Sequence, residues 1–190
     1  FSEDPLISGM MAAAITRGVQ AHPGKGVTIK HFAANNQEEN RYFSNSHVSE
    51  RALREIYLRG FQIAIREATP MSIMTSYNLL NGIHTANSFE LIQSVCRDEW
   101  GYQGLVMTDW NTSQNIPAFH GIPSGRYPIS ASTGCVRAGN DLQMPGCQKN
   151  VDDLIQAVTS GQPVDGFSVT LGDLQFCAAN VIRAVLATDV

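Results

Sequence analysis

The sequence predicts an α/β fold with a parallel sheet, built as about the C-terminal half of a (β/α)₈ barrel. Short apolar runs, typical of buried parallel strands, alternate with amphipathic stretches typical of helices. This strand-then-helix unit occurs four times after an opening helix, and polar side chains stand where the strands end. A complete barrel takes about 250 residues, so the 190 residues and four strand signals indicate a partial barrel. A flavodoxin-like open sheet is the structural alternative.

Apolar periodicity and turn residues position the elements before residue 100. The predicted helices are 5–19, 49–68 and a third that Ser88 caps, with Leu91, Ile92, Val95 and Cys96 facing inward; the predicted strands are 27–32 (VTIKHF) and 71–77 (MSIMTSY). Asp4 caps the first helix, and Pro5 is its first residue. A polar segment, 35–46, follows the first strand, and Asn81-Gly82 forms a turn after the second.

The elements after residue 100 follow the same reasoning. The strand 105–110 (LVMTDW) is preceded by turn residues, and a loop rich in Gly, Pro and Ser covers about 121–134. A short strand signal lies within 136–144, ended by Pro145-Gly146, and the helices 151–160 and 171–185 complete the chain.

Composition excludes several classes of function. The net charge of −4 leaves no basic footprint for nucleic acid, and no apolar run is long enough to cross a membrane. The first residues do not form a signal peptide, and the compartment stays unassigned. The four cysteines form no CxxC pair, so we expect no metal site. Cys135 and Cys147 are either a disulfide pair, if the protein is secreted, or free thiols, the more common state.

Three strand ends carry chemically useful side chains. Lys30 and His31 end the first strand, Tyr77 the second, and Asp109 and Trp110 the third. Each side chain also has a structural interpretation on its own. Lys30 could form an ion pair, His31 and Tyr77 could lie in the core, Asp109 could cap a helix, and Trp110 could be a packing lid. Because the carboxyl ends of parallel strands share one face, the five side chains converge if the sheet is parallel. Such a set suits a sugar, whose hydroxyls need polar partners and whose ring face needs an aromatic wall.

The sequence resembles glycoside hydrolase family 3, of the β-glucosidase type, over nearly its whole length. Six ordered stretches carry the resemblance: FSEDP (1–5), KHFAANNQEENR (30–41), SERALREIYLRGFQIAI (49–65), IMTSYNLLNG (73–82), LVMTDW (105–110) and AGNDLQMPG (138–146). The resemblance implies a TIM-barrel domain and a hydrolase that removes terminal β-D-glucosyl residues by double displacement, without a metal or organic cofactor.

The same resemblance implies roles for six residues. Asp109 matches the catalytic nucleophile. Five positions match substrate-binding residues: Lys30 and His31 bind the sugar in the −1 subsite, Met74 and Tyr77 line that subsite, and Trp110 borders the aglycone side. Arg41 matches an arginine often found in the family, to which we assign no role at this point.

Two departures from the family pattern shape the expected partners. We expect residues 1–190 to be part of the barrel domain, without the front of the barrel and without the α/β sandwich domain that supplies the acid/base glutamate. The remaining carboxylates do not match that motif: Glu38, Glu39, Asp98, Glu99 and Asp141. The expected partners are therefore a β-glucoside or oligosaccharide, a complementary half-barrel or second copy of the chain, and a sandwich domain. Ala33 after KHF argues against the N-acetylglucosaminidase branch, where a KHFPG-type stretch occurs.

Two other functions remain as alternatives. A non-catalytic glycan-binding or inert barrel fragment is favoured by the missing acid and the missing front half. A phosphate-using barrel enzyme ranks last, because 138–141 (AGND) is a poor phosphate loop.

Overall fold

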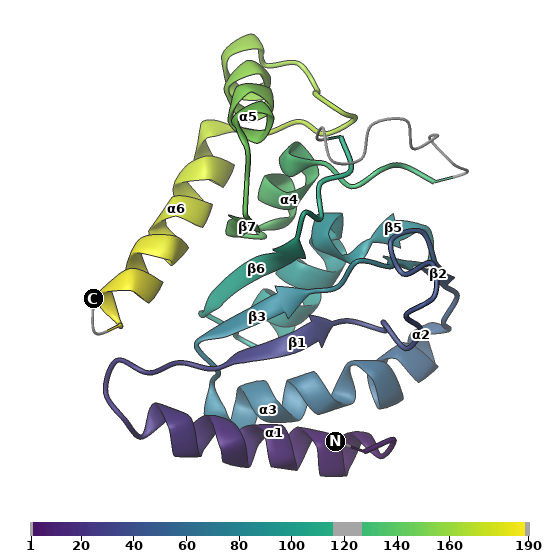
Figure 1. The fold of residues 1–190 in the computed structure, drawn as a ribbon, viewed down its shortest axis with the longest axis vertical. Coiled ribbons are helices and arrows are strands. Elements are labelled where there is room, and N and C mark those ends of the chain that lie inside the picture. Colours follow the sequence, from purple (N-terminus) through teal and green to yellow (C-terminus); the bar gives the residue numbers. More distant parts are fainter. Residues whose placement is uncertain (1, 116–126, 189–190) are drawn as a thin grey trace.

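The computed structural model describes residues 2–115 and 127–188. Its centre is a parallel sheet with the strand order β1-β3-β6-β7 (Figure 1). The strands are β1 (Thr28–Phe32), β3 (Ser72–Thr75), β6 (Leu105–Trp110) and β7 (Leu142–Met144). Consecutive strands of this sheet are neighbours and are joined through helices, as in successive units of a (β/α)₈ barrel. The predicted fold class is confirmed.

Two helical segments cover one side of β1 and lie side by side in Figure 1. The first is α1 (Pro5–Gln20), where the Asp4 carboxylate accepts from the main-chain N–H groups of Leu6 and Ile7, as predicted for its cap. The second is a continuous helix with a π-helical stretch: α2 (Glu50–Ala52), η1 (Leu53–Tyr57) and α3 (Arg59–Ala68). The two cross closely at Gly9, because a Cβ there would lie 2.8 Å from Ile63 Cβ.

The two faces of the sheet have different surroundings. The side chains of β1, β3 and β6 that face the helices are buried in the main hydrophobic core: Ile29, Phe32, Ile73 and Val106. The alternate side chains point the other way, toward what would be the inside of a closed barrel. Two of these, Met107 and Leu142, pair across β6 and β7 and are only half-buried. The inner face is therefore partly open to solvent.

A small second sheet and two short helical segments follow the carboxyl ends of β1 and β3. The small sheet contains β2 (Asn45–Ser46), β4 (Leu79–Leu80) and β5 (Ile83–His84). Asn81 and Gly82 both have positive φ, 50° and 92°, which makes the predicted turn a tight hairpin between β4 and β5. The segments η2 (Thr85–Asn87) and the π-helical η3 (Glu90–Glu99) come next, and the Ser88 hydroxyl accepts from the Leu91 N–H, as expected of a cap.

The C-terminal third corrects one prediction. Residues 136–138 do not begin a strand: they end the helix α4 (Ser132–Ala138), and only Leu142–Met144 forms β7. The helix is favoured because Val136 packs in a second hydrophobic cluster with α5 and α6, and Gly139 closes the helix at φ 76°. The predicted 121–134 loop lies partly outside the described residues, and its last three residues belong to α4.

The remaining helices are α5 (Gln148–Ser160) and α6 (Leu171–Leu186), which agree with the predicted ones apart from an earlier start of α5. All four cysteines are free, and Cys135 is buried within α4. The disulfide alternative for Cys135 and Cys147 is therefore wrong in this structure. Among the described helices, none has both the length and the apolar character needed to cross a bilayer.

Candidate active site

The carboxyl ends of β1, β3 and β6 bring three predicted residues together. His31 lies near the end of β1, Tyr77 lies two residues after β3, and Asp109 is the second-last residue of β6. Parallel pairing aligns these ends, since Ile73 pairs with both Ile29 and Val106. The polar residues at these strand ends therefore lie together in one cluster at one edge of the sheet.

Asp109 is held through both of its carboxylate oxygens. Its Oδ1 accepts from the main-chain N–H of Trp110 at 2.7 Å, and its Oδ2 lies 3.1 Å from Nε2 of His31. Burial raises the pKa of Asp109, but hydrogen bonds from His31, the Trp110 N–H and Tyr77 outweigh it and lower the pKa below its ordinary value. The carboxylate is therefore ionised at neutral pH, as a nucleophile must be.

Tyr77 is a buried hydrogen-bond donor next to this carboxylate. Its hydroxyl donates to the Trp110 carbonyl at 2.8 Å and also contacts the Asp109 carboxylate. Burial, a hydrogen bond with Tyr42 and the negative charge of Asp109 raise the pKa of Tyr77 far above its ordinary value. The phenol therefore keeps its proton throughout the pH range in which proteins work.

The other predicted residues surround this cluster less directly. Lys30 is exposed, and it lines, together with His31, a hollow of about 600 Å³ along the free edge of β1. Met74 is buried in β3 and pairs with Met107 of β6. Trp110 has 57% of its surface exposed, so its ring is free to contact a ligand. The structure thus brings His31, Tyr77 and Asp109 into contact and places Lys30, Met74 and Trp110 on the same strands.

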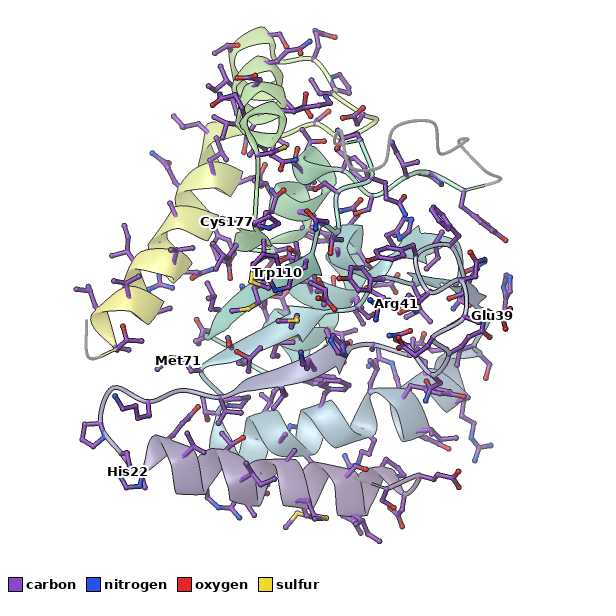
Figure 2. All side chains as sticks on the ribbon, in the orientation of Figure 1. His22, Glu39, Arg41, Met71, Trp110 and Cys177 are labelled. Carbon is purple, nitrogen blue, oxygen red and sulfur yellow. The ribbon has the colours of Figure 1, made fainter. Side chains whose placement is uncertain are left out.

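Two residues in the loop after β1 contact the cluster and carried no predicted role. The Tyr42 ring lies 4.3 Å from the Tyr77 ring, and the Arg41 guanidinium lies 4.7 Å from the Tyr77 ring centre. Arg41 and Trp110 are labelled in Figure 2. Their loop is the polar segment that the sequence already marked as following a strand end. The family pattern included Arg41, but no signal in the sequence pointed to Tyr42.

A comparison with known protein families shows the family to which this chain belongs. The family described as "Glycosyl hydrolase family 3 N terminal domain" matches residues 1–168. The chain belongs to glycosyl hydrolase family 3. This confirms the resemblance inferred from the six sequence stretches.

Relatives within family 3 agree along the whole chain. A beta-glucosidase of Ruminococcus albus is 42% identical over 190 residues, covering 99% of this chain and 19% of that protein. An exo-alpha-(1->6)-L-arabinopyranosidase of Bifidobacterium longum is 40% identical, covering 100% of this chain and 23% of that protein. The chain therefore spans about a fifth of the length of these relatives.

Solved structures of two beta-glucosidases contain the fold of this chain. A beta-glucosidase from Paenibacillus barengoltzii matches with a TM-score of 0.83 and 42% identity, covering all of this chain and 20% of that one. Beta-glucosidase 3B from Thermotoga neapolitana in complex with glucose matches with a TM-score of 0.83 and 37% identity, covering 98% and 24%. The fold of residues 1–190 thus matches about a fifth to a quarter of each of these two solved chains.

The other carboxylates singled out in the sequence have different surroundings from Asp109. Glu38 pairs with Arg41 at 2.8 Å, Glu99 pairs with Arg54, and Asp141 is buried against Arg97 at 2.7 Å. These three are engaged by cations, which suits an acid/base role poorly, because a partner cation favours the ionised form. Within residues 2–115 and 127–188, no three His, Cys, Asp or Glu side chains are grouped to hold a metal ion.

Proposed function

We propose that this chain supplies the nucleophile and part of the sugar-binding site of a retaining glycoside hydrolase of the β-glucosidase type. The observation that carries the proposal is the ionised Asp109 carboxylate, held between His31 and the Trp110 N–H at a strand end. Membership of family 3 and the beta-glucosidases among its relatives support the same assignment.

The proposed mechanism is a double displacement. A carboxylate oxygen of Asp109 attacks the anomeric carbon, and the bond from that carbon to the leaving oxygen breaks. An acid outside residues 1–190 protonates the leaving oxygen, and its conjugate base then takes a proton from water. The water oxygen attacks the anomeric carbon, and the carboxylate of Asp109 is released. Retention requires the two carboxyl groups to lie about 5–5.5 Å apart.

The neighbouring residues would bind the sugar during these steps. In this proposal Lys30 and His31 hydrogen-bond sugar hydroxyls, while Met74 and Tyr77 line the −1 subsite. Trp110 forms the apolar wall on the aglycone side, which suits its exposed ring. His31 has a second effect, because its contact with Asp109 also favours the ionised nucleophile.

Mechanism-based labelling tests the nucleophile. A 2-deoxy-2-fluoroglucoside should form a stable ester with Asp109 in the assembled, active enzyme. The fluorine slows hydrolysis of this covalent intermediate, so that the intermediate accumulates. Peptide mapping by mass spectrometry locates the ester. A label on a different carboxylate would reject the assignment, and no turnover of an aryl glucoside by any assembled form would favour the inert-fragment alternative.

The sugar needs a test of its own. Relatives at similar identity are named for a β-glucoside and for an α-L-arabinopyranoside. Nitrophenyl β-D-glucoside and nitrophenyl α-L-arabinopyranoside should therefore be compared by kcat/KM. A higher value for the glucoside supports the proposal, and a higher value for the arabinoside replaces its substrate.

We further propose that residues 1–190 act as part of a barrel domain that is completed by protein outside this segment. β1 and β7 are the edges of the four-stranded sheet, and the inner face is half open. The helix α1 exposes six apolar side chains by 38–57%: Leu6, Ile7, Met10, Met11, Ile15 and Val19. A complementary half-barrel, or a second copy of the chain, would cover these surfaces, and a sandwich domain would supply the acid/base.

Light scattering on the purified chain tests this need for a partner. We expect self-association or binding of a dye specific for exposed apolar surface. A monodisperse species of 20.7 kDa that unfolds cooperatively and binds no dye would contradict it.

A further inference from the structure

Gln114 connects three loops around the candidate site. It follows β6 and has only 6% of its surface exposed. Its side-chain Nε2 donates to the carbonyl of Tyr42 at 3.0 Å, across 72 residues of sequence. Its Oε1 accepts from the N–H of Ser130 at 3.0 Å, and its own N–H donates to the Ser130 carbonyl at 2.8 Å. One amide thus joins the loop after β1 to both ends of the segment between β6 and α4.

The third loop reaches Gln114 through His84. The Gln114 side chain hydrogen-bonds the His84 ring, and Nδ1 of that ring donates to the carbonyl of Tyr77 at 3.0 Å. His84 is 4% exposed, and burial lowers its pKa. The ring is therefore neutral, and a neutral imidazole with a proton on Nδ1 satisfies the contact with the carbonyl.

Both routes from Gln114 end at Tyr77. Tyr42, whose main chain Gln114 holds, places its ring 4.3 Å from the Tyr77 ring and hydrogen-bonds the Tyr77 hydroxyl. His84 holds the Tyr77 main chain. The main chain and the ring of Tyr77 are thus both fixed by groups that Gln114 contacts.

We propose that Gln114 is a positioning residue, which holds the Tyr77 hydroxyl against the Trp110 carbonyl and the Asp109 carboxylate. This inference rests on the proposed role of Asp109 and extends it to a residue that touches no substrate. Displacement of the phenol would remove one of the hydrogen bonds that keep Asp109 ionised. The other groups near the carboxylate are His31 from β1 and, behind Tyr77, Tyr42 and the Arg41–Glu38 pair.

The competing explanation is that Gln114 only closes a loop. Asn87 offers a matched control, because it is also a buried amide, 6% exposed, that accepts from the N–H of Ala131 at 3.0 Å and donates to the Ala131 carbonyl at 3.1 Å. It binds the chain one residue beyond Ser130. Within the described part of the chain its side-chain hydrogen bonds go to Ala131 and Cys135, and none of them involves Tyr42, His84 or Tyr77. An effect of loop closure alone should appear in Asn87→Ala as well as in Gln114→Ala.

The test is a double-mutant cycle in the assembled enzyme with a nitrophenyl glycoside. The variants are Gln114→Ala, Tyr77→Phe, their combination and Asn87→Ala, each measured for kcat/KM against pH. Gln114→Ala should lower kcat/KM about 10- to 100-fold, the range that a misplaced catalytic constellation costs. Its acidic limb should move to higher pH, because the nucleophile then protonates more readily. In the Tyr77→Phe background the same change should have little effect, since its target is gone.

Three results would overturn the proposal. One is an unchanged pH profile in Gln114→Ala, and another is an equal shift in Asn87→Ala. The third is a Gln114→Ala effect that is as large in the Tyr77→Phe background. If Gln114→Ala does not fold, Gln114→Glu replaces it in the cycle, since it keeps the acceptor for Ser130 and loses the donor to Tyr42. Fluoroglucoside labelling of the wild type separates the two proposals. If the label is on Asp109 and the Gln114 variants keep the kcat/KM and pH profile of the wild type, only the positioning role is rejected.

Discussion

Asp109 and Asp141 are two buried carboxylates at β6 that differ in their hydrogen-bond partners. Asp109 lies one residue before the end of β6, and its carboxylate is hydrogen-bonded by His31, the Trp110 N–H and Tyr77. Asp141 precedes β7 and has a fully buried side chain, where it accepts from Arg97 at 2.7 Å, the Val106 N–H at 2.8 Å and Asn180 at 2.8 Å.

The consequences for the two pKa values differ in sign. Hydrogen bonds lower the pKa of Asp109 in spite of burial, whereas burial raises the pKa of Asp141 in spite of Arg97. Asp141 is surrounded by protein on every side and holds η3, β6 and α6 together. The Asp109 side chain keeps 12% of its surface exposed, whereas that of Asp141 is fully buried. A carboxylate is available for chemistry when its charge is stabilised while one side stays open, and it is structural when protein groups occupy every side.

The largest expected difference between the two residues is in catalysis. Asp109→Asn should lower kcat in the assembled enzyme by about 10⁴-fold or more, as loss of a nucleophile does in other enzymes, while its melting temperature stays within a few degrees. Steady-state kinetics and calorimetry check both. Residual activity within tenfold of wild type would place the nucleophile elsewhere.

Asp141 should show the reverse pattern, with a large effect on stability. Asp141→Leu leaves the Arg97 guanidinium buried without a counter-charge and removes the acceptors for the Val106 N–H and Asn180, and a broken pair of this kind costs about 3–5 kcal/mol. Urea unfolding measures the loss. As a control, the double variant Arg97→Met/Asp141→Leu should lose less than the single variant, because no charge is then left buried. An Asp141→Leu protein as stable as wild type would show that the buried pair is not structural.

A smaller effect should separate Lys30 from His31. Each change to Ala should weaken glucose binding about tenfold, in the range of one hydrogen bond to a charged or polar partner, with little change in melting temperature. Only His31→Ala should also move the acidic limb of kcat/KM to higher pH, because only the loss of His31 removes a hydrogen bond to Asp109. Titration calorimetry with glucose and pH profiles test this. A loss of stability at unchanged glucose affinity would show that the two residues stabilise the fold and do not bind substrate.

The smallest expected effect is the pH dependence of stability. Since the folded pKa of Asp109 is depressed, its ionisation contributes stability above the unfolded pKa of about 4, and this contribution is lost as the pH falls through the folded pKa. The raised pKa of Asp141 has the opposite sign, so stability decreases as the pH rises through it. Unfolding free energies of wild type and Asp109→Asn, compared from neutral to acidic pH, should converge. A constant difference would show that the Asp109 pKa is not depressed.

The sequence by itself determined the elements and three members of the site. Apolar runs and helical stripes depend on local spacing, so the four strands of the parallel sheet and most helices could be predicted without a structure. The same holds for His31, Tyr77 and Asp109, because a polar residue directly after a buried strand reaches the shared edge of a parallel sheet wherever the loops go. The roles of these residues remain proposals.

Only the tertiary structure decided the features that depend on distant contacts. Val136 belongs to a helix because a cluster from α5 and α6 packs on it, which local spacing did not indicate. No pattern in the sequence indicated a partner for Asp141, yet Arg97, 44 residues away, forms an ion pair with it. Gln114 reaches Tyr42 over 72 residues. A side chain's partners at such separations are set by the paths of whole loops and by the packing of helices around the sheet, and no local pattern in the chain encodes either.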